Sequence, residues 1–346
     1  MRIGVIGAGA VGGAIAALLA TGGHDVTVTA RGEHLAAIRN GGIRLRGAWG
    51  EHDAAVTAGE LLSGSPELVF VATKAQDAAA ALRANRAAIG AAPVVVVQNG
   101  LGGVETARSA LAGPGGVDAG GSANPVVGAL AMFAASYLSP GEVTITTANP
   151  TFVGGDDDAA TRIVERVLGA VMPVKHVDDF ESAQWTKLVI NQINALPAVT
   201  GLSAQEVIAH RGLRLVLTRS MRESVRVAAA SGVRFATLGG LSAGMLAAFS
   251  RAPLWAAQAL PRLMARRMGS TPNPGSTLQS IRRGQPSEID YLNGAVVAAG
   301  EKAGVATPVN ALIVRLVHEV ESSKAFVVPE VVIARVATAT HDEPAA

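Results

Sequence analysis

The chain has 346 residues, of which 49% are apolar and 16% are charged, and this length predicts two domains with separate cores. Its 29 basic and 27 acidic side chains nearly balance, which excludes the basic excess of a nucleic-acid-binding protein. Cysteine is absent and the seven histidines are scattered. Disulfides and cysteine nucleophiles are therefore excluded, and no spacing typical of a metal site remains.

The segment from Ile3 to Gly23 carries no charged residue and is rich in glycine. A membrane or export segment is one interpretation of such an apolar run. The glycines, the β-branched start and the lack of a processing site after the run favour a strand, a turn and a helix instead. We therefore expect a cytoplasmic protein without a membrane partner.

The first half of the chain alternates short apolar segments with helical ones, a pattern typical of a parallel sheet with helices on both faces. The predicted strands are residues 2–7, 25–30, 67–73 and 93–98, and the predicted helices are residues 11–21, 33–40, 76–88 and 104–111. Two further strands, 128–136 and 142–148, flank a Ser-Pro-Gly turn. We expect this pair to extend the sheet in antiparallel fashion.

Helical periodicity takes over after Asp157, and a shift in composition at residues 173–180 marks the expected domain boundary. The expected fold class is α/β, with a Rossmann-type doubly wound sheet over residues 1–177 and an all-helical domain over residues 178–346. Residues 330–346 are expected to form a frayed tail. The basic run at 262–269 is either a membrane or partner surface or, more simply, the solvated face of a helix.

A glycine-rich turn joins the first predicted strand to the first predicted helix. In a dinucleotide-binding turn, the first glycine permits a tight turn, the second lets the backbone approach a pyrophosphate, and the third allows close helix packing. The helix N-terminus then offers free N–H groups to the phosphates. The residues predicted to bind a dinucleotide are Gly7, Ala8, Gly9, Ala10, Val11 and Gly12.

The end of the second strand discriminates between the two nicotinamide dinucleotides. An NAD site would carry an acidic residue about 20 residues after the glycines, where it binds the ribose 2′-hydroxyl. This chain has Arg31 there, and a guanidinium can grip a 2′-phosphate. NADP is therefore the expected cofactor, and the alternative is that Arg31 is only a surface residue.

Polar residues follow two of the predicted strands. Lys74 comes directly after the strand at 67–73, and Asn99 comes directly after the strand at 93–98. Either one alone would be an ordinary strand terminator. Ligands of doubly wound sheets bind beyond the carboxyl ends of the strands, so the two together are predicted to line the site for the cofactor and its substrate.

A polar stripe interrupts the apolar helix predicted at residues 181–195. Lys187, Asn191 and Asn194 are spaced i, i+4 and i+7, so they project along one face of that helix. The stripe either faces a cleft or is a solvated seam with a snorkelling lysine.

The run QPSEIDYLNG at residues 285–294 carries Glu288, with Asn273 and Ser276 shortly before it. From the residues alone, Glu288 is either functional or simply an acidic residue favoured in the first turn of a helix.

These motifs taken together resemble the ketopantoate reductase family, the 2-dehydropantoate 2-reductases, over nearly the full chain. They are GxGxxG, the arginine at the second strand end, ATK, QNG, the W-x-K-L-x-x-N helix and SEIDYLNG. The resemblance implies an NADPH-dependent oxidoreductase that reduces the ketone of 2-dehydropantoate to (R)-pantoate, a step towards pantothenate and coenzyme A. It also implies a helical domain like the C-terminal domain of 6-phosphogluconate dehydrogenase, with the active site in the cleft between the two domains.

The resemblance also assigns roles to individual residues. Lys187 matches the catalytic lysine, and Glu288 matches a glutamate that serves catalysis and the cofactor. The implied substrate contacts are Asn99, Asn191, Asn194, Asn273 and Ser276, and the implied cofactor contacts are residues 7–12, Arg31, Lys74, Asn99 and Glu288.

The chain departs from the family pattern at several places. Ala195 stands where the best-known members have a second helix asparagine, and Asn194 lies one place earlier. Ser280 replaces a family acidic residue, and the Arg-rich stretch 235–270 resembles an insertion. The substrate is consequently less well defined by the sequence than the reaction class.

Hydride transfer to a ketone develops negative charge on the carbonyl oxygen, so Lys187 is the expected general acid and Glu288 its neighbour. We expect burial to lower the pKa of Lys187 and Glu288 to raise it. Two alternatives remain: a reductase of another 2-oxo acid on the same scaffold, and an NADP-binding sensor without catalysis. The expected partners are NADPH and a small 2-oxo acid, and homodimer formation stays open.

Overall fold

The computed structural model describes residues 1–112, 124–269 and 272–341. It divides into two compact units, Met1–Phe180 and Glu181–Ala346. The sequence predicted the boundary within residues 173–180, with the first domain ending at residue 177. The predicted fold class is confirmed, because the first unit is a doubly wound α/β unit and the second is helical apart from one isolated bridge between Leu238 and Leu241.

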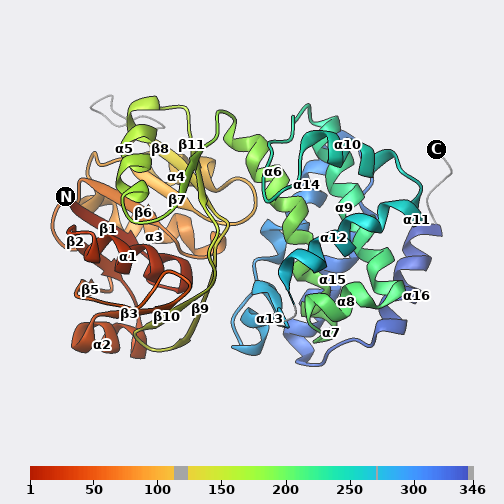
Figure 1. Cartoon of the computed structure of the whole chain (residues 1–346), viewed down its shortest axis with the longest axis horizontal. Coiled ribbons are helices and arrows are strands. Elements are labelled where there is room, and N and C mark those ends of the chain that lie inside the picture. Colours follow the sequence, from red (N-terminus) through yellow and green to blue (C-terminus); the bar gives the residue numbers. More distant parts are fainter. Residues whose placement is uncertain (113–123, 270–271, 342–346) are drawn as a thin grey trace. The chain divides into compact units, whose positions relative to one another are not determined.

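The first unit is organised around a sheet that has eight strands in the described residues (Figure 1). The order across the sheet is β12-β11-β8-β7-β6-β1-β2-β5. The chain builds β1, β2 and β5 towards one edge and then crosses back to β6, β7 and β8, so the topological switch point lies between β1 and β6. The strand bounds are β1 (Arg2–Ile6), β2 (Asp25–Thr29), β5 (Thr57–Gly59), β6 (Leu68–Val71), β7 (Val94–Val97), β8 (Val126–Ala131), β11 (Thr151–Gly154) and β12 (Val174–His176).

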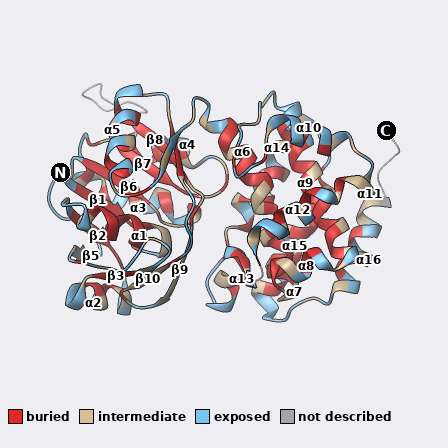
Figure 2. Cartoon of the chain, in the orientation of Figure 1, coloured by how far each residue is buried: buried red, intermediate tan, exposed pale blue. Residues whose placement is uncertain are grey.

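The central strands are buried on both faces, which explains their continuous apolar sequence. Every residue of β6 and β7 is buried, and Figure 2 shows these strands in red. Alternate side chains feed two cores: Val5, Phe70 and Val95 pack on the side of α1 (Ala10–Thr21) and α5 (Asp158–Gly169). Ile6 and Val71 pack on the side of α3 (Ala75–Ile89) and α4 (Gly103–Leu111).

A second sheet packs on the far side of α1, and it corrects one prediction. Its order is β4-β3-β10-β9, with β3 (Ile43–Gly47), β4 (His52–Ala54), β9 (Ala134–Ser139) and β10 (Glu142–Thr147). The strand predicted at 128–136 is two strands, because the chain leaves the main sheet after β8 and enters β9. β9 and β10 are antiparallel about the Ser-Pro-Gly turn as predicted, but they belong to this second sheet and do not extend the first.

The second unit is an assembly of helices around α9 (Arg211–Ala230), whose buried residues face α8, α10, α14, α15 and α16 (Figures 1 and 2). The remaining elements are α6 (Phe180–Asn191), η1 (Gln192–Asn194), α7 (Ala195–Thr200), α8 (Ala204–Ala209), α10 (Ala243–Arg251), α11 (Leu254–Ala257), α12 (Ala259–Met268), α13 (Gly275–Arg282), η2 (Ile289–Tyr291), α14 (Asn293–Ala303), α15 (Pro308–Ser323) and α16 (Pro329–His341).

Local capping divides residues 203–231 into two helices, α8 and α9. Ser203 and Glu206 form a capping box that starts α8. The ring of His210 accepts a hydrogen bond from the Leu213 N–H, which ends α8 and starts α9 one residue later. Hydrophobic periodicity does not reveal side-chain caps of this kind, because they depend on single polar residues.

The tail expected at residues 330–346 is wrong for its described part. Residues 329–341 form α16, in which Val332 and Val336 are fully buried at a spacing of i and i+4. These two side chains join the core of the helical unit, so their burial offsets the ordering of the segment. Residues 342–346 lie outside the described residues.

The Arg-rich stretch 235–270 contributes to the same core, and its last two structural elements are α11 and α12. In α12, Met264 is buried while Arg262, Arg266 and Arg267 are exposed. The basic run is therefore the solvated face of an amphipathic helix, which was the simpler of its two interpretations. In the part of the chain that the structure covers, no helix is long and apolar enough to cross a membrane.

Candidate functional site

The glycine turn between β1 and α1 is fixed by the end of β2. Gly7 has a φ of 95°, a conformation that glycine adopts without steric penalty. Its N–H donates to the Thr29 hydroxyl at 2.9 Å, and the Ala8 N–H donates to the Thr29 carbonyl at 2.9 Å. Gly9 is the N-cap of α1. The turn therefore presents the first N–H groups of α1 at the carboxyl edge of the sheet.

Two glycines of this turn have different steric roles. A Cβ on Gly12 would collide with the Gly7 carbonyl oxygen, so only glycine allows α1 to pack this closely. A Cβ on Gly9 would meet nothing within 4 Å, so the space in front of Gly9 is open. The first turn of α1 carries no acidic residue. The turn thus has the free N–H groups, the space and the electrostatics that a pyrophosphate needs.

His34 was not singled out by the sequence, yet it braces this turn. Its Nε2 lies 2.6 Å from the Ala8 carbonyl oxygen, and its Nδ1 accepts a hydrogen bond from the Gly141 N–H at 3.0 Å. The second bond fixes the tautomer, because Nδ1 must be unprotonated and Nε2 must carry the donated proton. His34 therefore ties the glycine turn to the hairpin of the second sheet.

Arg31 is the N-cap residue of α2 (Gly32–Gly41), just after the end of β2; its side chain forms no capping hydrogen bond, and the residue is exposed. No acidic residue occupies this strand end, and the nearest carboxylate in the sequence is Glu33, in the first turn of α2. The arrangement leaves a guanidinium at the position where an NAD site would place a carboxylate.

Lys74 and Asn99 lie at the ends of two neighbouring strands. β6 and β7 pair in parallel with Val71 opposite Val96, and Lys74 and Asn99 follow them. The Gln98 side chain donates from Nε2 to the Thr73 carbonyl at 3.0 Å and so binds the two strand-end loops together. Gly7 is close to the same loop, because a Cβ on it would lie 2.9 Å from the Thr73 nitrogen. The glycine turn, Lys74 and Asn99 therefore share the edge at the topological switch point.

In the helical unit, Lys187 lies inside a helix that is buried nearly all round. Only 6% of its surface is exposed, and Trp185, Thr186 and Leu188 beside it are buried as well. Burial lowers the pKa of Lys187 to about 8, while the negative charge of Glu288 raises it. A lysine so placed can change its protonation state near neutral pH.

Glu288 is held in place by the backbone on both sides of it. The Ser287 N–H donates to Glu321 Oε1 at 2.7 Å, and Ile289 is completely buried in the core. Glu288 itself is the N-cap residue of η2 and is half-buried. The backbone around Glu288 is thus anchored, and the negative charge of Glu288 lies close enough to Lys187 to raise its pKa. Its assigned contact with the cofactor stays a prediction.

The asparagines of the polar stripe lie where α6 ends. Asn191 is the last residue of α6 and Asn194 the last of η1, and both are half-buried. Asn194 faces the turn before α13, since a Cβ on Gly275 would lie 2.7 Å from its Oδ1. The Asn273 Oδ1 accepts a hydrogen bond from the Gly275 N–H at 2.9 Å and so shapes this turn. The structure therefore brings Asn194 together with residues 273–276, where Ser276 is exposed.

A buried polar network that the sequence did not indicate lies behind the stripe. Asn293 donates to Gln192 Oε1 at 2.6 Å and to Asn310 Oδ1 at 2.9 Å, and Ser220 donates to both acceptors, at 2.7 and 3.0 Å. Glu223 accepts hydrogen bonds from the Asn310 side chain and N–H. Because Gln192 follows Asn191, the network fixes the end of α6 against α9, α14 and α15.

Each unit thus holds its own set of the predicted residues. The first unit gathers the glycine turn, Lys74 and Asn99, with Arg31 at the end of β2. The second gathers Lys187 with Glu288, and Asn194 with the turn at residues 273–276. Within the described ranges, no group of three or more His, Asp or Glu side chains is placed to hold a metal ion.

Two family models match the chain, one covering most of each unit. The model described as ketopantoate reductase PanE/ApbA matches residues 3–157, and the model of the C-terminal part of that family matches residues 179–321. A 2-dehydropantoate 2-reductase of Archaeoglobus fulgidus is 27% identical over 326 residues, covering 93% of this chain and 98% of its own.

Solved structures share the fold over the same length. The crystal structure of a PanE/ApbA family ketopantoate reductase from Ralstonia eutropha JMP134 superposes with a TM-score of 0.77 at 28% identity, covering 94% of this chain and 99% of its own. A D-mandelate dehydrogenase, solved with NADH and anilino(oxo)acetate, also has a TM-score of 0.77, at 21% identity and with 93% and 99% coverage. The latter likeness concerns the fold alone.

Proposed function

The chain belongs to the ketopantoate reductase family, a family of NAD(P)-dependent 2-oxo acid reductases, and we propose that it reduces 2-dehydropantoate to (R)-pantoate with NADPH. The observation that carries the proposal is the buried Lys187 beside Glu288. Burying an ammonium group lowers the stability of the fold, so its presence here indicates a functional role. A pKa near the working pH is what a proton donor requires. A sensor without catalysis would need neither.

The reaction needs a hydride, which NADPH supplies when bound, and a proton for the ketone oxygen. Lys187 donates that proton, and its positive charge stabilises the oxygen as negative charge develops there. Glu288 keeps a larger fraction of the lysine protonated than burial alone would allow. Asn191 and Asn194 offer amide hydrogen bonds to the carboxylate and hydroxyl of the substrate.

Arg31 supports NADP as the cofactor. Its exposed guanidinium at the end of β2 can pair with a 2′-phosphate, and Arg–phosphate pairs are charge-assisted and bidentate. We expect Arg31→Ala to raise KM for NADPH by about tenfold or more, the loss of about 1.4 kcal/mol, and to leave KM for NADH within about twofold. Initial-rate kinetics with both cofactors measure this. Equal changes for the two cofactors would show that Arg31 does not contact the 2′-phosphate.

The pKa of Lys187 predicts the alkaline limit of activity. The ammonium form donates the proton, so the rate is high below a pH of about 8 and falls as pH rises through that value. Glu288→Gln removes the charge that raises this pKa, so the descending limb should move to lower pH. Profiles of kcat/KM against pH for both proteins test this, and a limb that stays in place or moves upward in the variant contradicts the assignment.

A reductase of a different 2-oxo acid is the second candidate, and one observation favours it. Ala195 is buried and apolar at the position where the best-known members of the family have an asparagine, so one polar substrate contact is replaced by a methyl group. The fold does not decide between substrates, because a D-mandelate dehydrogenase shares it. Asn194 precedes this position and lies against Gly275, so it can supply the missing amide, and we therefore prefer 2-dehydropantoate.

A substrate panel tests the proposal. NADPH oxidation is followed at 340 nm with 2-dehydropantoate, pyruvate and phenylglyoxylate, and kcat/KM is compared. We expect 2-dehydropantoate to exceed the other two by about 10²-fold or more, because a site built to hydrogen-bond a substrate hydroxyl rejects analogues that lack it. Preference for phenylglyoxylate or pyruvate would instead support the second candidate. NADPH binding without turnover of any 2-oxo acid would support a sensor.

A further inference from the structure

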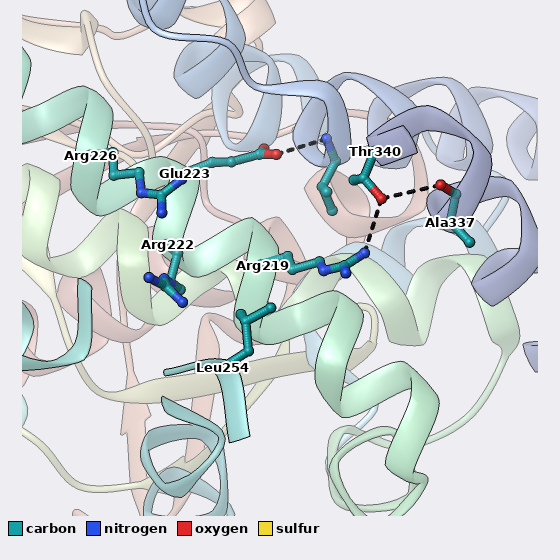
Figure 3. A pocket seen from close by; sticks show the side chains of 8 residues that line it. Arg219, Arg222, Glu223, Arg226, Leu254, Ala337 and Thr340 are labelled. Atoms are coloured by element: carbon teal, nitrogen blue, oxygen red, sulfur yellow. Dashed lines mark hydrogen bonds between the residues drawn. The ribbon is translucent and has the colours of Figure 1, made fainter. Parts of the chain in front are cut away.

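A cavity of about 320 Å³ lies within the helical unit, beside the central helix α9. Its walls come from α9, α11, α16 and the start of α15 (Figure 3). None of the residues assigned to catalysis, substrate or cofactor lines it. Its volume falls at the lower end of the range of small-molecule sites, roughly 300–1,000 Å³.

Three arginines dominate the cavity. Arg219, Arg222 and Arg226 are spaced i, i+3 and i+7, so they project from one face of α9, as Figure 3 shows. Arg219 donates to the Thr340 hydroxyl at 3.1 Å, and Arg222 donates to the Ser250 carbonyl at 2.7 Å. Two of the three guanidinium groups are thereby held in place, Arg219 by α16 and Arg222 by α10.

The remaining bonding capacity of these arginines is unused. The Arg222 Nε is buried and has no hydrogen-bond partner, and the Arg226 side chain forms neither a hydrogen bond nor an ion pair with any residue that the structure describes. Burial and the nearby charge of Arg226 both lower the pKa of Arg222. The like charges are therefore close enough to repel each other, a cost that a bound anion would remove.

The cavity carries an excess of positive charge. Glu223 is the one acidic residue among its lining residues, and its carboxylate accepts hydrogen bonds from the Val309 N–H, the Asn310 N–H and the Asn310 side chain, at 2.9, 2.9 and 2.6 Å. The sequence contains no Asp or Glu between Glu223 and Glu288, so α10, α11 and α12 bring no further acidic residue. The lining of the cavity thus has three guanidinium groups and one carboxylate, and that carboxylate is already hydrogen-bonded to Val309 and Asn310.

We propose that this cavity is a second binding site, for a small phosphorylated molecule whose phosphate or diphosphate group is held by Arg222 and Arg226. Guanidinium groups match the geometry and charge of phosphate oxygens better than any other side chain does. Arg219 on the same helix, and the Thr340 hydroxyl on α16, lie in the same cavity and can add further contacts to the anion. Leu254 supplies an apolar wall for the organic part of the ligand.

Pyrophosphate is the probe that tests this site in the full-length protein. Hydrogen–deuterium exchange is compared with and without pyrophosphate, at an ionic strength matched with KCl. Peptides that cover α9 (residues 211–230) and α16 (residues 329–341) report on the cavity, and peptides that cover residues 1–31 report separately on the glycine turn. The readout does not depend on catalysis, so failure here and failure of the proposed function are distinguishable.

The expected result is protection of α9 and α16 that saturates with pyrophosphate. In Arg226→Gln the apparent Kd from these peptides should rise about tenfold or more, because a charge-assisted hydrogen bond is lost. Arg226 has no partner in the described protein, so its replacement should not disturb folding. Arg315→Gln, which removes the same charge from an exposed position on α15, should change Kd by less than about twofold. Absence of protection at α9, or equal changes in the two variants, would overturn the proposal.

Discussion

Replacing Lys187 by alanine is expected to lower kcat for ketone reduction by about 10²-fold or more, the typical contribution of a positioned general acid. Only 6% of the Lys187 surface is exposed, so solvent water cannot easily take its place as the proton donor. Stopped assays of NADPH oxidation with the preferred 2-oxo acid measure the effect. The Kd for NADPH should stay within about threefold of the wild-type value, because the glycine turn belongs to the other unit.

Lys302→Ala is the matched control for this substitution. Lys302 is an exposed lysine on α14, and its removal takes away the same charge from the same unit. We expect its kcat to equal that of the unmodified protein within about twofold. Similar rates for Lys187→Ala and Lys302→Ala would remove Lys187 from the mechanism.

Replacing Asn310 by leucine is expected to lower the free energy of unfolding of the helical unit by about 3 kcal/mol or more. Asn310 is completely buried, and its side chain donates to Glu223 and Ser220 while it accepts from Asn293 and Ser220. Leucine has a similar size but leaves these partners buried without hydrogen bonds, which costs more than the bonds themselves contribute. Urea unfolding followed by tryptophan emission, in a background where Trp49 and Trp255 are replaced by phenylalanine so that the buried Trp185 alone reports, measures the loss.

Gln285→Leu serves as the comparison, because it makes the same kind of change at an exposed position of the same unit. Its free energy of unfolding should stay within about 0.5 kcal/mol of the original value. If Asn310→Leu also stays within that range, the network around Gln192 does not hold the end of α6 in place.

The sequence was sufficient for the central sheet because local composition and burial agree there. Each residue of β6 and β7 is apolar and faces a core, so a run such as Val94–Val97 has no other stable arrangement. The glycine turn was equally readable, since the collision of a Gly12 Cβ with the Gly7 carbonyl permits a single residue type. Short-range sterics of this kind leave a direct trace in the sequence.

The second sheet and the bracing of the glycine turn depend on contacts between residues far apart in the chain. His34 bonds to Gly141, 107 residues away, and β3 pairs with β10. No local pattern at 128–136 announces that the chain changes sheets between β8 and β9. These strands pair where they pack on the outer side of α1, and that packing forms only when the whole unit is assembled.

The candidate catalytic group is an intermediate case. The spacing of Lys187, Asn191 and Asn194 indicated one polar face, which required only the helical period. The burial of Lys187 and the influence of Glu288 on its pKa arise from elements that are about a hundred residues apart. The stripe was therefore predictable from spacing alone, whereas the two effects on the pKa of Lys187 were predicted only because the family resemblance placed Glu288 beside it.

Transfer of the hydride to 2-dehydropantoate tests the central claim most directly. The purified protein is given NADPH that carries deuterium at the transferable position of the nicotinamide, together with 2-dehydropantoate, and the product is analysed by mass spectrometry. We expect pantoate one mass unit heavier than the product formed with unlabelled NADPH, because a reductase moves that hydride to the ketone carbon. Tight binding of NADPH with no labelled pantoate, or label found only in a different hydroxy acid, would contradict the assignment.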